Sequence, residues 1–319
     1  MRIGIVGATG LTGRTLLDIL EKAPEPVEIA YLSASSSSAG REISFKDQSI
    51  EIVTTDQYAL SQSVDIVFMA CSTELSMEWV PRALEHCSWV IDFSSAFRMK
   101  KEVPLVVPEI NGDVLENYKG LIANPNCSTI QLAKTCHPLA KKYGLQKVVV
   151  STYQSVSGMG QKGIDQLQKE EEGMLFAENL PLHHNVVPWI GPFTRDDYCD
   201  EEQKIIEEMR KILRIPGLPV YPTTVRVPVP ICHGESVYLE TERSLGVQEA
   251  IDLWKQTEGL QYTHEIACPV HMAHQNEVLI GHARSPEGNI LQFWSVADNL
   301  RVGSAWNAYQ ILKLLDNWV

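Results

Sequence analysis

Three glycines at positions 7, 10 and 13 limit the fold of this chain more than any other feature of it. They follow an apolar run from Arg2 to Val6 and precede an amphipathic pattern from Arg14 to Lys22. The glycines therefore form a turn between a strand and a helix. A tight turn between a strand and a helix that binds no ligand would also require glycines. In this position, however, the spacing favours a dinucleotide site, where the backbone approaches a pyrophosphate and the helix start binds it.

Strands and helices continue to alternate after this turn. Strand-like runs at 27–32, 64–70 and 89–92 and a helical run at 74–87 predict a doubly wound, Rossmann-type parallel sheet. The second half has strand-like runs that indicate a mixed or antiparallel sheet, at 147–154, 223–230, 236–241, 276–283 and 290–297. A length of 319 residues suggests two domains. The predicted fold class is thus α/β, with a second α+β domain.

The loop after the second strand bears on which dinucleotide binds. It reads Ser33 to Arg41 and contains Ser35, Ser36 and Ser37 but no acidic residue. An acid here would hold the ribose 2′-OH of NAD. Small hydroxyl residues with Arg41 nearby would accept a 2′-phosphate, so the sequence favours NADP (NADPH), with NAD possible. A serine run is also typical of a flexible loop.

Cys127 is the first candidate nucleophile. A short apolar run at 120–123 ends in Asn124-Pro125-Asn126, and a helical pattern opens at Ser128. Unpaired N–H groups and the helix dipole at such a position lower the pKa of a thiol and favour thiolate. A buried structural cysteine before a helix would read the same way.

Other polar residues can be interpreted either as structural or as functional. His233, between two strand-like runs, has an ordinary pKa near ~6.5 and is suited to proton exchange, or is a hydrogen-bonded structural residue. Arg98 follows a predicted strand end, where ligands of α/β sheets bind, and its guanidinium suits phosphate. Glu201 and Lys204 lie one helical turn apart, as solvated pairs do. We interpret His183-His184 as structural.

Composition excludes several classes of partner. A net charge of −13 argues against nucleic acid, and no apolar run reaches the ~20 residues that cross a bilayer. Residues 1–7 enter a strand without signal-peptide organisation, so we expect a cytoplasmic protein. Seven cysteines without a CxxC pair predict free thiols and no metal site.

The chain resembles the aspartate-semialdehyde dehydrogenase family. The matching segments follow one another along nearly the whole chain: GATGLTG (7–13), SSAFRM (94–99), PLVVPEIN (104–111), ANPNCSTIQ (123–131), STYQSVSGMGQKG (151–163), NVVPWI (185–190), TVRVPVPICHGES (224–236) and DNLRVGSAWNA (298–308). NPNCST, TYQ-VSG and RVPV with the following His are highly specific to the family. The resemblance implies that Cys127 is a nucleophile.

The resemblance also implies roles for residues around that thiol. His233 would be the acid/base, Gln154 would position the bound intermediate, and Arg226 would bind the substrate carboxylate. The remaining implied substrate contacts are Glu201, Lys204, the phosphate-binding Arg98 and Asn126. Implied cofactor contacts are Gly7, Thr9, Gly10, Leu11, Thr12, Gly13, Ser35, Ser36, Ser37, Ser157, Gly158 and, at the nicotinamide end, Asn299.

The family's domain plan predicts a discontinuous dinucleotide-binding domain, 1–126 plus 300–319. The catalytic and dimerisation domain would then be 127–299, resembling the second domain of glyceraldehyde-3-phosphate dehydrogenase, in a homodimer or homotetramer. One departure concerns the cofactor: the family often has an Arg where this chain has Ser37. That difference bears on NADP preference and leaves the chemistry untouched. The chain is also somewhat short for the family.

The resemblance implies NADPH-dependent, reversible reductive dephosphorylation of L-aspartyl 4-phosphate to L-aspartate 4-semialdehyde through a Cys127 thioester. Such a reaction serves synthesis of lysine, threonine, methionine and diaminopimelate, with aspartyl phosphate, the semialdehyde and phosphate as small-molecule partners. The alternatives are N-acetyl-γ-glutamyl-phosphate reductase, a catalytically silent nucleotide-binding protein, and a thiol acyltransferase without a redox step. The RVPV…CHGES and TYQ-VSG segments favour the aspartate enzyme over the first.

Overall fold

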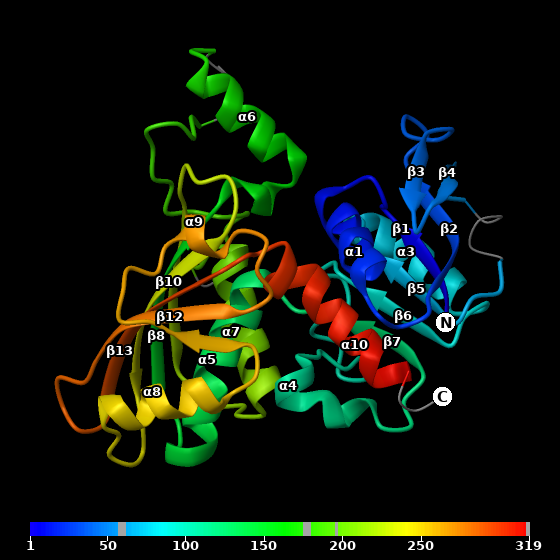
Figure 1. Ribbon diagram of the computed structural model, residues 1–319. Coiled ribbons are helices and arrows are strands. Elements are labelled where there is room, and N and C mark those ends of the chain that lie inside the picture. The colour runs from blue at the N-terminus through cyan, green and yellow to red at the C-terminus, as the bar shows by residue number, and fades with distance from the viewer. Residues whose placement is uncertain (57–61, 175–179, 195–196, 317–319) are drawn as a thin grey trace. The chain divides into compact units, whose positions relative to one another are not determined.

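The computed structural model describes residues 1–56, 62–174, 180–194 and 197–316. The chain forms two compact units (Figure 1). Unit 1 comprises Met1–Pro125 and Ser304–Val319, and unit 2 comprises Asn126–Gly303. Among the helices of the described ranges, none combines the length and the apolar character that crossing a membrane requires.

Unit 1 contains a seven-stranded sheet in the order β3-β4-β2-β1-β5-β6-β7. All neighbouring strands are parallel except β3 and β4, which form an antiparallel hairpin. The strands are β1 (Arg2–Val6), β2 (Glu28–Ala34), β3 (Glu42–Phe45), β4 (Gln48–Thr54), β5 (Ile66–Met69), β6 (Trp89–Asp92) and β7 (Gly120–Ala123). The strand order reverses at β1, so the turn after β1 lies where open α/β sheets bind ligands.

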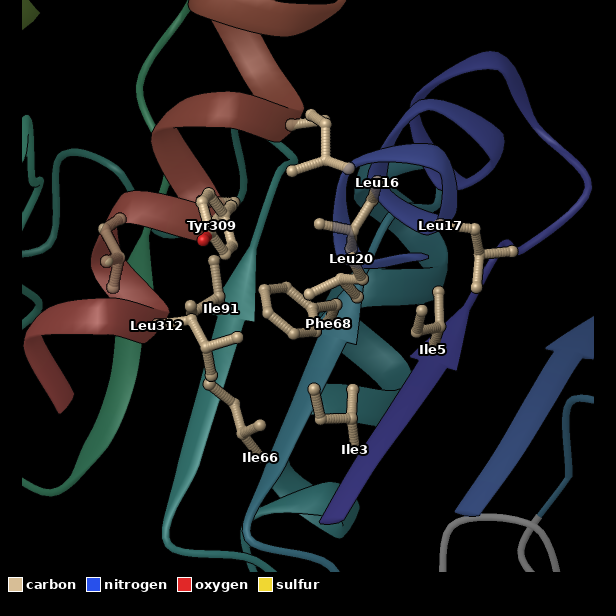
Figure 2. Close-up of a cluster of buried hydrophobic side chains, with 14 of the residues drawn as sticks. Ile3, Ile5, Leu16, Leu17, Leu20, Ile66, Phe68, Ile91, Tyr309 and Leu312 are labelled. Atoms are coloured by element: carbon tan, nitrogen blue, oxygen red, sulfur yellow. The ribbon is translucent and has the colours of Figure 1, made fainter. Parts of the chain in front are cut away.

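Helices from both ends of the chain belong to unit 1. They are α1 (Leu11–Lys22), α3 (Thr73–Ala83), α4 (Pro108–Asn111), the 3-10 turn η1 (Gly112–Leu115) and α10 (Trp306–Asp316). Figure 2 shows α1 and α10 packing on one side of the sheet, with Leu16 and Leu20 of α1 and Leu312 of α10 meeting Ile3 and Phe68 of the strands. This core explains why the last helix returns to the first unit: its apolar stripe completes the cover of β1, β5 and β6.

Unit 2 contains a six-stranded mixed sheet in the order β11-β12-β13-β10-β8-β9. Two pairs, β8 with β9 and β11 with β12, are parallel and the others antiparallel. The strands are β8 (Lys147–Gln154), β9 (Val220–Arg226), β10 (His233–Glu240), β11 (Leu260–Tyr262), β12 (Val278–Arg284) and β13 (Ile290–Ala297). The fold class predicted from sequence is confirmed by this pair of sheets.

The helices of unit 2 are α5 (Cys127–Tyr143), η2 (Val156–Met159), α6 (Gln161–Glu171), α7 (Asp200–Leu213), α8 (Val247–Gln256) and α9 (Pro269–Met272). α5 packs against both α7 and α8 and contacts β12 and β13, so one face of the sheet is covered. Burial alternates from residue to residue along β8, along the first part of β9 and along the last part of β10. The opposite sheet face leaves Val149, Tyr153 and Tyr221 at 38%, 40% and 50% exposure.

Two strand predictions from sequence differ from the structure. The strand expected at 223–230 is Val220–Arg226, because Pro228 and Pro230 have no N–H for a ladder and Val229 N turns back to Val227 O at 2.8 Å. The strand expected from 236 already begins at His233. The last helix of the chain is preceded by a π-helical segment, η3 (Arg301–Ala305), which leads directly into α10.

Candidate active site

Cys127 is the first residue of α5, immediately after the N-cap residue Asn126. The Asn126 side chain accepts hydrogen bonds from Ser128 N and Thr129 N at 3.0 and 3.1 Å, which caps the helix. The sulfur of Cys127 therefore lies at the positive end of a long helix, where negative charge is stabilised. This arrangement suits a thiolate nucleophile.

The imidazole of His233 lies against that sulfur. The distance from Nε2 to Cys127 Sγ is 3.2 Å. On its other side, Nδ1 accepts from the backbone N–H of Ser155 at 3.0 Å, so Nε2 is the nitrogen that carries the hydrogen of the neutral ring. His233 is fully buried, and burial, followed by the charge of Arg226, lowers its pKa to about 3. The residue is thus neutral at pH 7 in the free protein, rather than titrating near its ordinary value.

Ser155 links His233 to the residues predicted to meet the cofactor. Its hydroxyl lies 3.1 Å from His233 Nδ1 and donates to Asn299 Oδ1 at 3.0 Å. The same Asn299 oxygen accepts from Ser157 Oγ and from Cys232 N, at 3.1 and 3.0 Å. Cys232 has a φ of +79°, a strained conformation for a residue with a side chain. Asn299 therefore holds together the loops on which His233 and Ser157 stand.

Arg226 ends β9 beside these loops. Its Nη1 donates to Ser155 O at 2.5 Å, and burial lowers its pKa. A side chain at Gly158 would come within 2.9 Å of the same nitrogen, so glycine there leaves room for the guanidinium. Arg226 also lines a cavity of about 600 Å³, whose other walls come from Met159, from α6 and from residues 180–191. A buried cation open to a cavity is suited to a carboxylate.

Gln154, Glu201 and Asn126 form one hydrogen-bonded group. Glu201 Oε1 accepts from Asn126 Nδ2 at 2.9 Å and from Gln154 Nε2 at 3.2 Å. Glu201 is 7% exposed, and Lys204 lies 3.8 Å from its other oxygen and 2.5 Å from Asp200. The predicted site residues of unit 2 are thus brought into one network around Cys127, although Asn126 uses its side chain largely to cap α5.

The glycine turn of unit 1 has the geometry of a phosphate cradle. Gly7 has a φ of +82°, and a Cβ there would meet Ala70 O at 2.1 Å. A Cβ at Gly13 would meet Gly7 O at 2.3 Å. Gly10 is the N-cap of α1 without a side-chain cap, Thr9 precedes it in the turn, and Leu11 and Thr12 open the helix. The residues present therefore fit a dinucleotide pyrophosphate.

The serine loop lies beside this turn. Gly7 N and Ala8 N both bond to Ser33 O, at 2.8 and 3.1 Å, which joins the end of β2 to the glycine turn. Ser35 Oγ and Ser37 Oγ lie 3.0 Å apart in the following turn, where Ser36 is exposed. Arg41 Nη2 donates to Ser37 O at 3.4 Å. A cationic side chain thus reaches the loop from a position four residues after Ser37.

Arg98 is buried in unit 1. Its Nε donates to Asn124 O at 3.0 Å and its Nη2 to Phe93 O at 2.7 Å. These carbonyls follow the carboxyl ends of β7 and β6. The guanidinium is therefore fixed at the ligand-binding edge of the parallel sheet.

Sequence reasoning missed three residues around Cys127: Ser155, Gly303 and Glu208. A Cβ at Gly303 would lie 2.7 Å from Cys127 Cβ, so the backbone of η3 passes directly against the nucleophile. Glycine inside a helical pattern was the signal for such a close approach. Glu208 accepts from Asn126 N at 2.6 Å and had no signal, since it looks like one charge in an amphipathic helix.

Glu235 is a further buried acid on β10, two residues after His233. It is fully buried, accepts from Ser295 Oγ at 3.3 Å, and burial raises its pKa well above the ordinary value. In the part of the chain that the structure describes, no three His, Cys, Asp or Glu side chains gather as a metal site requires. All seven cysteines are free thiols.

Comparison with known families matches both units. A family model described as "Semialdehyde dehydrogenase, NAD binding domain" matches residues 2–118, and one described as "Semialdehyde dehydrogenase, dimerisation domain" matches residues 136–302. The residues that match the NAD-binding model lie in unit 1, which carries the glycine turn. The residues that match the dimerisation model lie in unit 2, which carries His233.

Individual relatives agree with these matches over nearly the whole length of the chain. Aspartate-semialdehyde dehydrogenase of Aquifex aeolicus is 38% identical, over 98% of this chain and 97% of its own length. That of Bacillus subtilis is 35% identical, over 99% and 97%. The crystal structure of aspartate semialdehyde dehydrogenase II of Vibrio cholerae, complexed with ASA, superposes with a TM-score of 0.94 at 35% identity, covering 99% of this chain and 98% of that one.

Proposed function

This chain belongs to the aspartate-semialdehyde dehydrogenase family, and from that premise we propose that it catalyses the reversible, nicotinamide-dependent reductive dephosphorylation of L-aspartyl 4-phosphate to L-aspartate 4-semialdehyde. The observation that carries the proposal is the 3.2 Å contact of Cys127 Sγ with His233 Nε2 at the start of α5. The relatives' shared name disfavours N-acetyl-γ-glutamyl-phosphate reductase, the nearest alternative. The reaction belongs to synthesis of the aspartate-family amino acids.

In the first step the Cys127 thiolate attacks the acyl carbon of aspartyl phosphate. A C–S bond forms, the bond from carbon to the phosphate oxygen breaks, and inorganic phosphate leaves with the electron pair. The product is a thioester on Cys127. The negative charge that develops on the carbonyl oxygen is stabilised by the positive potential of the helix start and by His233 Nε2–H.

In the second step the thioester is reduced. A nicotinamide dinucleotide bound to the protein would supply the hydride that the thioester carbon accepts. His233 is placed to hydrogen-bond the resulting oxygen and to exchange its proton as the acid/base while the C–S bond breaks. The aldehyde leaves and the thiolate returns. Because the pKa of His233 is lowered, the imidazole starts this step neutral, with its hydrogen directed at the sulfur.

Substrate binding is proposed for the polar groups around the nucleophile. Arg226, buried and open to the cavity, binds the α-carboxylate. Gln154 and Glu201 hold the acyl group and its amine, and Lys204 and Arg98 bind phosphate. Asn126 contributes through the backbone turn that it caps.

For the cofactor we propose NADP over NAD. The support is Arg41, whose guanidinium reaches Ser37 O and supplies the positive charge that an Arg at position 37 would otherwise bring. Arg41→Ala should raise the KM for NADP about tenfold and leave the KM for NAD nearly unchanged, since one charge-assisted contact to the 2′-phosphate is lost. Equal effects on both cofactors would contradict this assignment, and Arg14→Ala, a change in α1 outside the serine loop, is the control.

We propose that unit 1 (Met1–Pro125 with Ser304–Val319) is the dinucleotide-binding domain and unit 2 (Asn126–Gly303) the catalytic and dimerisation domain. The dimer would use the open face of the unit 2 sheet, where Tyr153 and Trp294 pack with ring centroids 5.4 Å apart and Val149 and Tyr221 are exposed. Tyr221→Glu should weaken the dimer in analytical ultracentrifugation. Seven free thiols support a cytoplasmic location.

The decisive experiment follows reduction of NADP, and separately of NAD, with L-aspartate 4-semialdehyde and phosphate. We expect turnover that requires both the aldehyde and phosphate. N-acetyl-L-glutamate 5-semialdehyde in the same assay should turn over at least about 100-fold more slowly, because the Arg226 pocket is not matched to an N-acetyl group. Turnover that does not depend on phosphate, or a preference for the N-acetyl substrate, would refute the proposal.

A further inference from the structure

Glu208 is a buried carboxylate that the proposed reaction does not use. It lies on α7 and is 1% exposed. Its Oε2 accepts from the backbone N–H of Asn126 at 2.6 Å, a contact between residues 82 apart in the sequence. Asn126 directly precedes Cys127, so this carboxylate is bonded to the Pro125–Asn126 peptide group, one residue before the nucleophile.

A second carboxylate of α7 holds the same residue from its side chain. Glu201 lies seven residues before Glu208, which is two helical turns and the same helix face. Its Oε1 accepts from Asn126 Nδ2 at 2.9 Å, while Asn126 Oδ1 accepts from two N–H groups of α5. The backbone and both ends of the side-chain amide of Asn126 are therefore hydrogen-bonded, which fixes the turn that leads into Cys127.

These contacts have an electrostatic as well as a geometric effect. The thiol is faced by His233 from β10, by Arg226 from β9, and by the capped start of its own helix. Arg226 and the helix start favour thiolate, whereas a carboxylate beside the helix start opposes it. Glu208 thus combines a hydrogen bond to the residue before the sulfur with a negative charge beside the helix start, which disfavours thiolate.

We propose that Glu208 is a positioning residue of the nucleophile, acting through the Asn126 backbone. The inference rests on the proposed role of Cys127 and adds the residue that fixes its location and moderates its ionisation. The geometric effect and the charge effect can be separated, because aspartate keeps the charge but not the reach, and glutamine keeps the reach but not the charge.

The experiment compares Glu208→Asp and Glu208→Gln with wild type and with Glu207→Gln. Glu207 is the matched control, because it neighbours Glu208 on α7 and its carboxylate accepts from Gln203 Nε2 of the same helix at 2.8 Å. Two quantities are measured: kcat and KM for the semialdehyde, and the pH dependence of alkylation of Cys127 by iodoacetamide, followed by mass spectrometry of the peptide that contains Cys127.

Glu208→Asp should lower kcat about tenfold with little change in KM, because the sulfur is displaced from its productive position. Glu208→Gln should lower kcat less, and should move the midpoint of Cys127 alkylation to lower pH by about half a unit, because a negative charge near the thiol is lost. Glu207→Gln should match wild type in both measurements.

The proposal is overturned if both Glu208 variants keep the wild-type kcat and alkylation profile. It is also overturned if their losses follow only the fraction of folded protein, determined by circular dichroism at the assay temperature. The alkylation profile needs no turnover. A failure of the dehydrogenase reaction in the wild type would therefore be distinguishable from a failure of the role assigned to Glu208.

Discussion

The helix starts of α1 and α5 solve the same local problem in opposite ways. Each follows a parallel strand and a polar turn, and each has N–H groups without intrahelical partners. At α1 the N-cap is Gly10, with no side-chain cap and no acidic residue in the first turn. At α5 the N-cap is Asn126, which bonds Ser128 N and Thr129 N and is itself held by Glu201 and Glu208.

The difference shows how a helix N-terminus can serve two functions. A start without a side-chain cap leaves its N–H groups and its positive potential for an anionic ligand, which fits the pyrophosphate of a dinucleotide. A capped start keeps its dipole but closes its N–H groups, so the potential acts on the side chain that stands there. In this chain that side chain is the thiol of Cys127. A helix N-terminus therefore binds an anionic ligand at α1 and favours the thiolate of Cys127 at α5.

The largest expected effect is at the capped start. Cys127→Ala should lower kcat by at least about 10⁴-fold, because the covalent route is lost while the cap and the substrate contacts remain. The measurement is semialdehyde oxidation at saturating cofactor. Cys268→Ala, which changes a half-exposed thiol at the N-cap of the short helix α9, should keep wild-type activity. If Cys127→Ala kept a kcat within tenfold of wild type, Cys127 would not be the nucleophile and the start of α5 would have only a structural role.

The second test is at the open start. Gly10→Ala should leave the fold intact, because its φ is −70° and the nearest atom to the added Cβ is Gly7 O at 3.4 Å. It should weaken dinucleotide binding about 100-fold, or about 2.7 kcal/mol, because a methyl group enters the space of the pyrophosphate. Isothermal titration with the cofactor measures this. An unchanged Kd together with an unchanged fold would mean that the anion does not bind there.

Acid pH tests the surroundings of the capped start, since His233 contacts Cys127. With a pKa lowered to about 3 in the folded state and 6.5 when unfolded, His233 binds fewer protons in the folded chain between these values. Its contribution to stability is therefore complete above pH 6.5 and is lost as the pH falls. From pH 7.5 to 5, wild type should lose about 2 kcal/mol more of its unfolding free energy than His233→Gln. Urea titrations at both pH values measure it.

The raised pKa of Glu235 acts in the opposite direction, since a buried carboxyl that stays protonated costs stability above its ordinary pKa. It is present in both proteins, so it cancels in the comparison of wild type with His233→Gln. Parallel pH profiles of the two proteins would show that His233 is protonated in the folded state.

The smallest effect should come from the cap itself. Asn126→Ala should lower the unfolding free energy by about 1 kcal/mol through loss of the bonds to Ser128 N and Thr129 N. Thermal unfolding measures it, and Gly10→Ala serves as the comparison at a start that has no side-chain cap to lose. A loss at position 10 equal to that at 126 would remove the contrast between the two starts.

The fold could be predicted from sequence wherever a residue pattern has a single physical explanation. The glycine spacing at 7, 10 and 13 and the β-branched run at 147–154 carry their own physical reasons, and both predicted sheets are confirmed. The β3–β4 hairpin and α8 had no equally clear pattern. The strand expected at 223–230 lies earlier, at Val220–Arg226, because the prolines after Arg226 cannot donate to the ladder.

The candidate site divides in the same way. Cys127 and His233 belong to recognisable segments, so they could be named in advance as expectations. Glu208 and Ser155 could not, because their contacts join residues 82 and 78 apart and depend on the packing of α7 and β10. The state of His233 was also beyond the sequence, since it follows from complete burial and the neighbouring Arg226.

The glycine at position 303 has a consequence for how such chains diverge. Helix propensity alone would favour alanine there by about 1 kcal/mol, whereas any Cβ would meet Cys127 at 2.7 Å. An alanine that would stabilise the helix at position 303 is therefore excluded by the Cβ of the reactive cysteine. A descendant that has given up the thiol for glycine escapes much of that conflict, so a bulkier residue at this position would mark lineages in which the chemistry has been abandoned.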